Sequence, residues 1–169
     1  MTIICDHKSV GILVKKGEAI LIIERKKFPA GFALPAGHLD GDDFNEAAVR
    51  ELREETGIEA ITLKLILDEE IPNPCRRENG THHQWQVFSA SKWHGELKPS
   101  IDETKSIEWA DSKRILELAK RAETFAEKHK SSISDIANLT TTLSNDSEWQ
   151  ASPGLEPVWF YFLKRLHEI

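Results

Sequence analysis

Apolar residues recur along the first two thirds of the chain in spacings typical of strands. Residues 10–14 and 19–23 are β-branched apolar runs, and the polar segment 15–18 between them predicts a hairpin turn. The second run is apolar on both faces, which predicts a central strand. Further runs at 61–67, 84–90 and 106–109 predict three more strands. This part of the chain is therefore expected to form a sheet.

Helical spacing occurs once inside this region and twice after it. Residues 43–56 predict a helix, with Asp42 or Asp43 as its N-cap and Gly57 as its stop. Apolar residues from 111 to about 129 follow the i, i+3, i+4, i+7 spacing. A similar stripe covers 155–167, where Pro157 falls in the first turn. Segments 28–41, 70–80 and 131–152 predict loops, with at most a short strand or short helical turns.

These elements predict a single α/β domain. Its core is expected over about residues 5–125, followed by a helical C-terminal extension over about residues 126–169. A length of 169 residues suits one domain. The aromatic residues Trp159, Phe160 and Phe162 are expected to make core contacts or a homodimer interface.

Charge and cysteine content narrow the functional classes. The formal net charge of −6 argues against a nucleic-acid-binding surface, although not against a small anionic ligand held through a metal ion. Cys5 and Cys75 have no CxxC spacing, so neither a disulfide framework nor a structural zinc site is expected. Residues 1–8 do not resemble a signal peptide, and no apolar run approaches the ~18–20 residues of a membrane helix. We therefore expect a cytoplasmic protein with no membrane partner.

Three carboxylates gather on one face of the helix predicted at 43–56. Glu51, Glu54 and Glu55 are three or four residues apart or adjacent, so they share a face and repel one another. A hard divalent cation such as Mg²⁺, which prefers oxygen ligands, would neutralise them. Arg50 precedes Glu54 by four residues and is expected to pair with it. Four side chains on roughly the opposite side are expected to dock on the sheet: Ala48, Val49, Leu52 and Thr56.

Residues 37–58 resemble the Nudix box, Gly-x5-Glu-x7-Arg-Glu-U-x-Glu-Glu-x-Gly-U, in which U is aliphatic. The second half matches at every fixed position, through Arg50, Glu51, Leu52, Glu54, Glu55, Gly57 and Ile58. The first half departs from the pattern, because Asp42 replaces the first Glu and the gap after Gly37 is one residue short. An ungapped alignment places Ala36 where the glycine belongs.

The resemblance implies the Nudix fold, a mixed β-sheet sandwiched between helices. It also implies a metal-dependent hydrolase that cleaves the diphosphate linkage of a nucleoside diphosphate joined to another group. Glu51, Glu54 and Glu55 would then bind Mg²⁺ or Mn²⁺, the Gly37 carbonyl would add a ligand, and Arg50 would orient them. The general base would be either a box glutamate or Glu103 on a later loop.

Three arginines are candidate substrate contacts, because the guanidinium group binds phosphate in a bidentate manner: Arg25, Arg76 and Arg77. Pro74 falls sixteen residues after the box. A proline near that offset is associated with the ADP-ribose-hydrolysing subgroup, which favours ADP-ribose or a nucleotide sugar as the small-molecule nucleotide substrate. Two alternatives stay open, a house-cleaning (deoxy)nucleoside triphosphate pyrophosphatase and a non-catalytic nucleotide-binding Nudix module.

Other polar and aromatic residues have two interpretations each. His82 and His83 are neighbours on a strand and point to opposite faces, so one is expected to line a pocket and the other to lie on the surface. Cys75 is expected to be a bystander. Trp85 and Trp109 are either core residues or platforms that stack on a base.

Overall fold

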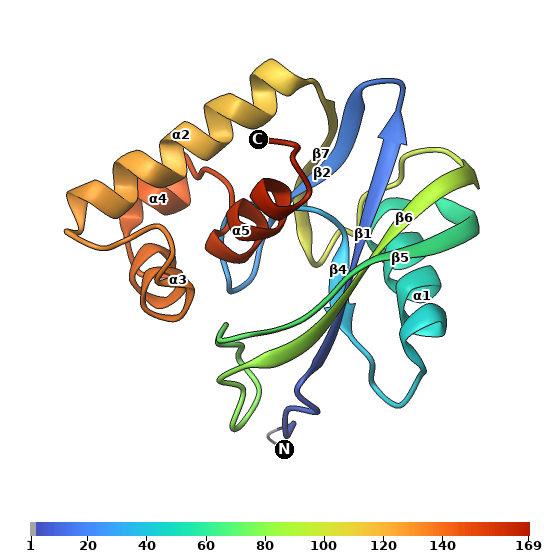
Figure 1. The fold of residues 1–169 in the computed structure, drawn as a ribbon, viewed down its shortest axis with the longest axis horizontal. Coiled ribbons are helices and arrows are strands. Elements are labelled where there is room, and N and C mark those ends of the chain that lie inside the picture. Colours follow the sequence, from blue (N-terminus) through green and yellow to red (C-terminus); the bar gives the residue numbers. More distant parts are fainter. Residues whose placement is uncertain (1–2) are drawn as a thin grey trace.

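A mixed seven-stranded sheet lies between helices in the computed structural model, which describes residues 3–169 (Figure 1). The strands are β1 (Lys8–Lys16), β2 (Ala19–Arg25), β3 (Phe32–Ala33), β4 (Ala36–His38), β5 (Glu59–Ile71), β6 (His83–His94) and β7 (Thr104–Ala110). The helices are α1 (Phe44–Thr56), α2 (Ser112–Lys128), α3 (Ile136–Ser144), α4 (Ser147–Ala151) and α5 (Pro157–Arg165). The predicted α/β fold class is confirmed.

Strand β1 organises the sheet. It pairs in parallel with β6 and antiparallel with both β2 and β4, which gives the order β3-β2-β1-β6-β5 with β4 beside β1 and β7 beside β2. The hairpin predicted at 15–18 joins β1 to β2. The second apolar run lies inside the sheet as predicted, because β2 also pairs with β3 and β7.

The two faces of the sheet build two cores. Helix α1 covers one face, while α2 to α5 lie on the other (Figure 1). Val10, Ile12 and Val14 alternate along β1 and share a core with Ala48 and Leu52 of α1. The opposite face carries the larger core, which contains residues from β2, α2, α3 and α5.

Helix α5 is fitted closely onto β1. A Cβ atom on Gly11 would lie 2.3 Å from Cη2 of Trp159, so only glycine leaves room for this indole. Trp159 packs edge to face with Trp85 and Phe162. Trp159, Phe160 and Phe162 are all buried, so of the two roles predicted for these residues the structure shows the core role.

The loop predicted at 131–152 is mostly helical, so that prediction was wrong. Helices α3 and α4 occupy this segment, and each begins at an aspartate whose side chain accepts backbone N–H groups, Asp135 and Asp146. Leu139 and Leu143 of α3 are buried in the larger core. Their helical spacing is masked in the sequence by the serine, threonine and asparagine residues around them.

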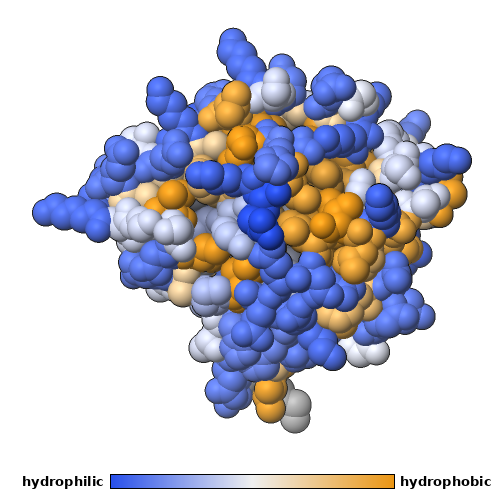
Figure 2. Space-filling view, viewed as in Figure 1, coloured by the Kyte–Doolittle hydropathy of each residue, from blue (hydrophilic) through white to orange (hydrophobic). Residues whose placement is uncertain are grey.

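The strands at 61–67 and 84–90 are longer than predicted, because β5 and β6 pair along almost their whole length. The loop expected from residue 70 therefore begins only after Ile71, and it is partly buried, with Asn73 shielded from solvent. On the face seen in Figure 2, hydrophilic residues form most of the outline and apolar residues show mainly near the centre and right. No helix within residues 3–169 is long and apolar enough to cross a membrane.

Candidate functional site

Helix α1 has the ends that the sequence predicts. Asp43 is its N-cap and forms a capping box with Glu46, since each side chain accepts a hydrogen bond from the other's backbone N–H. Gly57 ends the helix at φ 78°, a conformation that favours glycine, and donates its N–H to the Arg53 carbonyl. These local signals fix where the acidic residues begin and end.

The acidic residues of α1 differ sharply in exposure. Glu51 and Glu55 are only 8% and 3% exposed, whereas the Glu54 side chain is 56% exposed. The buried side of the helix includes these two glutamates. It is therefore rotated away from Val49 relative to the predicted buried side. Val49 is 37% exposed, so the prediction that it docks on the sheet was wrong, while Ala48 and Leu52 do dock there.

The backbone of β4 lies directly on the two buried carboxylates. A Cβ atom on Gly37 would lie 2.1 Å from Cδ of Glu51, so any other residue here would displace this carboxylate. The neighbouring Ala36 donates its N–H to Oε2 of Glu55 at 2.9 Å. Gly37, rather than Ala36, is therefore the box glycine.

Arg50 holds the shortened loop against the helix. Its guanidinium donates to Oδ2 of Asp42 at 2.7 Å and to Oε1 of Glu51 at 2.5 Å. It also donates to the carbonyls of His38 and Leu39 at 3.0 and 3.1 Å. The predicted partner, Glu54, lies 3.7 Å away. Arg50 therefore orients Glu51 more directly than Glu54.

Burial changes the acidity of the two shielded carboxyls. It raises the pKa of Glu51 to about 7, against the opposing effect of Arg50. It raises the pKa of Glu55 to about 8, against the opposing charge of Arg25. Carboxylates that resist ionisation on their own favour a cation beside them. Because all the donors here are oxygens, the set fits Mg²⁺ or Mn²⁺.

The loop that carries Glu103 is fastened to the end of α1. Lys98 and Ser100 donate their N–H groups to the carbonyls of Thr56 and Glu55 at 2.7 and 3.2 Å. The Glu103 carboxylate is exposed and lies 3.2 Å from Nζ of Lys27. Its charge contributes to the raised pKa values of both buried box glutamates, which places it within electrostatic reach of them.

An ion pair joins β2 to the C-terminal region. Arg25 Nε lies 3.3 Å from Oε1 of Glu156, the residue that precedes α5; the Glu156 side chain is buried, whereas the Arg25 side chain is 23% exposed. Burial raises the pKa of Glu156 to about 7, and the Arg25 charge opposes this shift. The sequence reasoning missed Glu156, although a lone acid between Leu155 and Pro157 in an apolar stretch was a usable signal.

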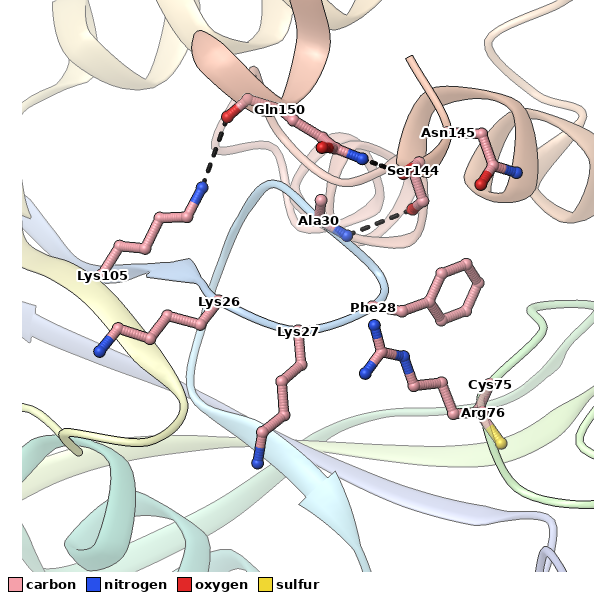
Figure 3. A pocket seen from close by; sticks show the side chains of 10 residues that line it. All are labelled: Lys26, Lys27, Phe28, Ala30, Cys75, Arg76, Lys105, Ser144, Asn145 and Gln150. Carbon is pink, nitrogen blue, oxygen red and sulfur yellow. Dashed lines mark hydrogen bonds between the residues drawn. The ribbon is translucent and has the colours of Figure 1, made fainter. Parts of the chain in front are cut away.

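Two pockets adjoin each other at Cys75, and the narrower one includes the box glycine Gly37. The narrower one, about 60 Å³, is lined in part by Arg25, Gly37 and Trp85. The larger one, about 560 Å³, shares Cys75 with it and is lined by basic residues from several segments (Figure 3). These are Lys26, Lys27, Arg76 and Lys105, with Phe28, Ser144, Asn145 and Gln150 among the other lining residues.

The structure separates the three predicted arginines. Arg25 lines the narrow pocket, and Arg76 lines the larger one together with Phe28 (Figure 3). Arg77 is absent from the lining of both pockets and instead forms an ion pair with Asp40.

The remaining candidates divide between pocket and surface. His83 is buried and lines the narrow pocket, whereas His82 is partly exposed and stacks on His7. Trp85 is buried in that pocket's wall, and Trp109 stacks on Trp93. Cys75 lies against both pockets, and its Sγ is 3.7 Å from Sγ of Cys5.

Comparisons with known proteins agree with this arrangement. The chain is 34% identical over 118 residues to the ADP-ribose pyrophosphatase of Methanocaldococcus jannaschii, covering 67% of this chain and 68% of that protein. It is 30% identical over 103 residues to the NAD-capped RNA hydrolase NudC of Pseudomonas aeruginosa, covering 60% of this chain. The matched region spans about a third (34%) of the length of NudC.

A solved structure, the MutT NUDIX hydrolase from Burkholderia pseudomallei, shares 25% identity and superposes with a TM-score of 0.57, covering 64% of this chain and 84% of the other. The family model of the NUDIX domain matches residues 6–132. That stretch covers most of the chain and includes the strands, the loop and the helix that build the acidic site. This protein therefore belongs to the Nudix hydrolase family.

Proposed function

We propose that this protein uses Mg²⁺ or Mn²⁺ to hydrolyse the diphosphate linkage of a nucleoside diphosphate joined to another group. The observation that carries the proposal is the contact of the Gly37 backbone with the buried Glu51 carboxylate, with Glu55 held beside it. It brings the two carboxylates against β4, in which Gly37 lines the narrow pocket together with Arg25.

The residues around the carboxylates hold them in fixed positions. Arg50 fixes Glu51, and the Ala36 N–H fixes Glu55, so neither side chain must reorganise to bind a cation. Glu54, being exposed, is free to face solvent and substrate. A divalent ion bound here would neutralise the diphosphate charge and lower the pKa of a bound water.

Arg25 and the basic pocket supply the complementary charge for the substrate. Arg25 lies in the narrow pocket with Gly37, where it can reach a phosphate oxygen. The larger pocket has the size of a small-molecule site, roughly 300–1,000 Å³. Its four basic side chains suit an anionic group on the far side of the scissile linkage.

Among substrates of this class, we propose ADP-ribose or a nucleotide sugar. The named activity of the Methanocaldococcus relative, an ADP-ribose pyrophosphatase, supports this choice, and the Pseudomonas relative is named as a hydrolase of NAD-capped RNA. The (deoxy)nucleoside triphosphate alternative rests on the same four basic side chains, which would also neutralise a triphosphate.

The test is a substrate panel with purified protein and Mg²⁺, offering ADP-ribose, nucleotide sugars, dinucleotides and nucleoside triphosphates. We expect Glu54→Gln and Glu55→Gln to reduce turnover by at least about a hundredfold. Glu123→Gln, on the exposed side of α2, removes the same charge far from the box and is the control. Near-normal rates in both box variants would contradict the metal assignment, and binding without turnover on any substrate would favour a binding module.

A further inference from the structure

Four soft metal ligands converge beside the narrow pocket. Cys5, His38, Cys75 and His83 each offer one ligand atom, and these four atoms all lie within 4.8 Å of one another. They come from the segment before β1, the end of β4, the loop after β5 and the start of β6. The cluster contains both cysteines of the chain. We propose that these four residues bind one Zn²⁺ ion.

Four of the six spacings between the ligand atoms are close to those of a tetrahedral zinc site. Zinc bond lengths of about 2.3 Å to sulfur and about 2.0–2.1 Å to nitrogen imply separations of about 3.8 Å between sulfurs, about 3.3 Å between nitrogens and about 3.6 Å between sulfur and nitrogen. The two Sγ atoms are 3.7 Å apart, and the two Nε2 atoms are 3.2 Å apart. Cys5 Sγ lies 3.1 Å and 3.8 Å from Nε2 of His83 and His38.

Neighbouring groups prepare the ligands to bind a metal. Nδ1 of His83 lies 3.0 Å from the Asn73 carbonyl, so Nδ1 carries the proton. Nε2 is then unprotonated, and its lone pair can coordinate the ion. Backbone N–H groups donate to both sulfurs, from His7 to Cys5 at 3.3 Å and from Arg77 to Cys75 at 3.4 Å. Such donors stabilise thiolates, which are the form of cysteine that binds zinc.

The fold also leaves room for the sulfur of Cys75. A Cβ atom on Gly80 would lie 2.1 Å from that Sγ, so the loop closes around the sulfur only with glycine at this position. The narrow pocket reaches three of the four ligands and gives an ion a route to the site. The sequence argument against a zinc site rested on spacing along the chain, whereas these ligands come together only in the fold.

The proposed site has a structural role, because four protein ligands leave no open position for a substrate. One ion would hold four segments that are distant in sequence. It would also support the box, since His38 follows Gly37 directly and its carbonyl accepts a hydrogen bond from Arg50. The site is separate from the carboxylates of α1, so it stands whether or not the proposed hydrolysis is correct.

The first test measures metal in the full chain. Apo protein, reduced with a phosphine and incubated with Zn²⁺, should retain about one zinc per chain after gel filtration. With Co²⁺ instead, it should show the visible bands of tetrahedral cobalt and a thiolate charge-transfer band in the near ultraviolet. Less than about a tenth of an equivalent of zinc, or a cobalt spectrum without the thiolate band, would overturn the proposal.

Matched variants assign the ligands. Cys75→Ser and His83→Ala should each lose the tight zinc and change the cobalt spectrum, while His82→Ala, one residue away and outside the cluster, should keep both. Removing zinc from the wild type with a zinc-selective chelator should lower Tm by about 5–10 °C. An unchanged cobalt spectrum in folded Cys75→Ser protein, or an equal loss in His82→Ala, would contradict the assignment. None of these measurements depends on hydrolytic activity.

Discussion

Gly37 shows how one missing side chain positions the acidic site. Because there is no Cβ, the strand backbone approaches the Glu51 carboxylate to a distance that no other residue type allows. The sequence pattern named this glycine, yet the shortened loop left Ala36 as a competing choice. The packing of β4 on α1 decides which of the two residues is the box glycine, because it shows that Gly37 lies against the Glu51 carboxylate.

A substitution at this contact gives a prediction. Gly37→Ala should lower the free energy of unfolding by about 1–3 kcal/mol, because the new methyl group overlaps the Glu51 side chain. Adding Glu51→Asp withdraws the carboxylate by one methylene and should restore part of that loss. Urea unfolding of the two single variants and the double variant measures the coupling. Strictly additive losses of unfolding free energy would show that the two side chains are not in contact.

The pKa of Glu55 gives a pH prediction for the metal-free protein. Its folded pKa is raised from 4.5 to about 8, so its contribution to stability is fully present below about pH 4.5 and is lost as the pH rises through about 8. Glu55→Gln stays neutral throughout. The variant should therefore gain stability relative to the wild type from about pH 5 to 9, by on the order of a few kcal/mol.

Urea unfolding in EDTA at several pH values measures this difference. Glu123→Gln, which alters an exposed carboxylate, should show no such trend. If the curves of wild type and Glu55→Gln run parallel across the range, the Glu55 carboxyl does not carry the raised pKa.

At the scale of elements, helices with long apolar stripes or signals at both ends were predictable, whereas α3 was not, despite its N-cap Asp135. Asp43 and Gly57 mark the ends of α1 in the sequence itself, and the structure places the caps there. In contrast, α3 hides Leu139 and Leu143 among polar residues, and its stability depends on burial against distant elements. Val49 was misplaced for a related reason, because a helical pattern does not reveal that two glutamates belong to the buried side.

Helix α5 gives the prediction at this scale. Trp159 is 0% exposed and fills the space above Gly11, so Trp159→Ala should lower the free energy of unfolding by about 3–5 kcal/mol. Trp93→Ala removes an indole of the same size from a partly exposed stack with Trp109 and should cost less than about 2 kcal/mol. Urea unfolding compares them, and equal losses would contradict the central place of α5 in the core.

At the scale of the whole molecule, residues far apart in sequence meet in ways that no local pattern shows. The larger pocket joins the loop after β2, the loop after β5 and the segment of α3 and α4 (Figure 3). Arg76 and Arg77 are adjacent, and residue type could not tell them apart. Their separation follows from the loop's path, which turns one side chain to the pocket and the other to Asp40.

These two arginines form a matched pair for the proposed function. Arg76→Gln should raise KM for the best substrate by about tenfold with little change in kcat, because it removes charge from the pocket without touching the box. Arg77→Gln removes the same charge one residue away, outside the pocket lining, and should leave KM within about twofold. Steady-state kinetics measure KM and kcat of both variants. Equal changes in KM would show that the larger pocket does not bind the substrate.

The fastening of the 95–103 loop to the end of α1 has an evolutionary consequence. Since Lys98 and Ser100 donate hydrogen bonds to the last turn of the helix, the position of Glu103 depends on the length of the short segment that follows them. Glu103 is also held from the other side, because its carbonyl accepts a hydrogen bond from Lys26 and the Thr104 N–H donates to Ser100. Insertions between Ser100 and Glu103 should therefore be rare among related chains.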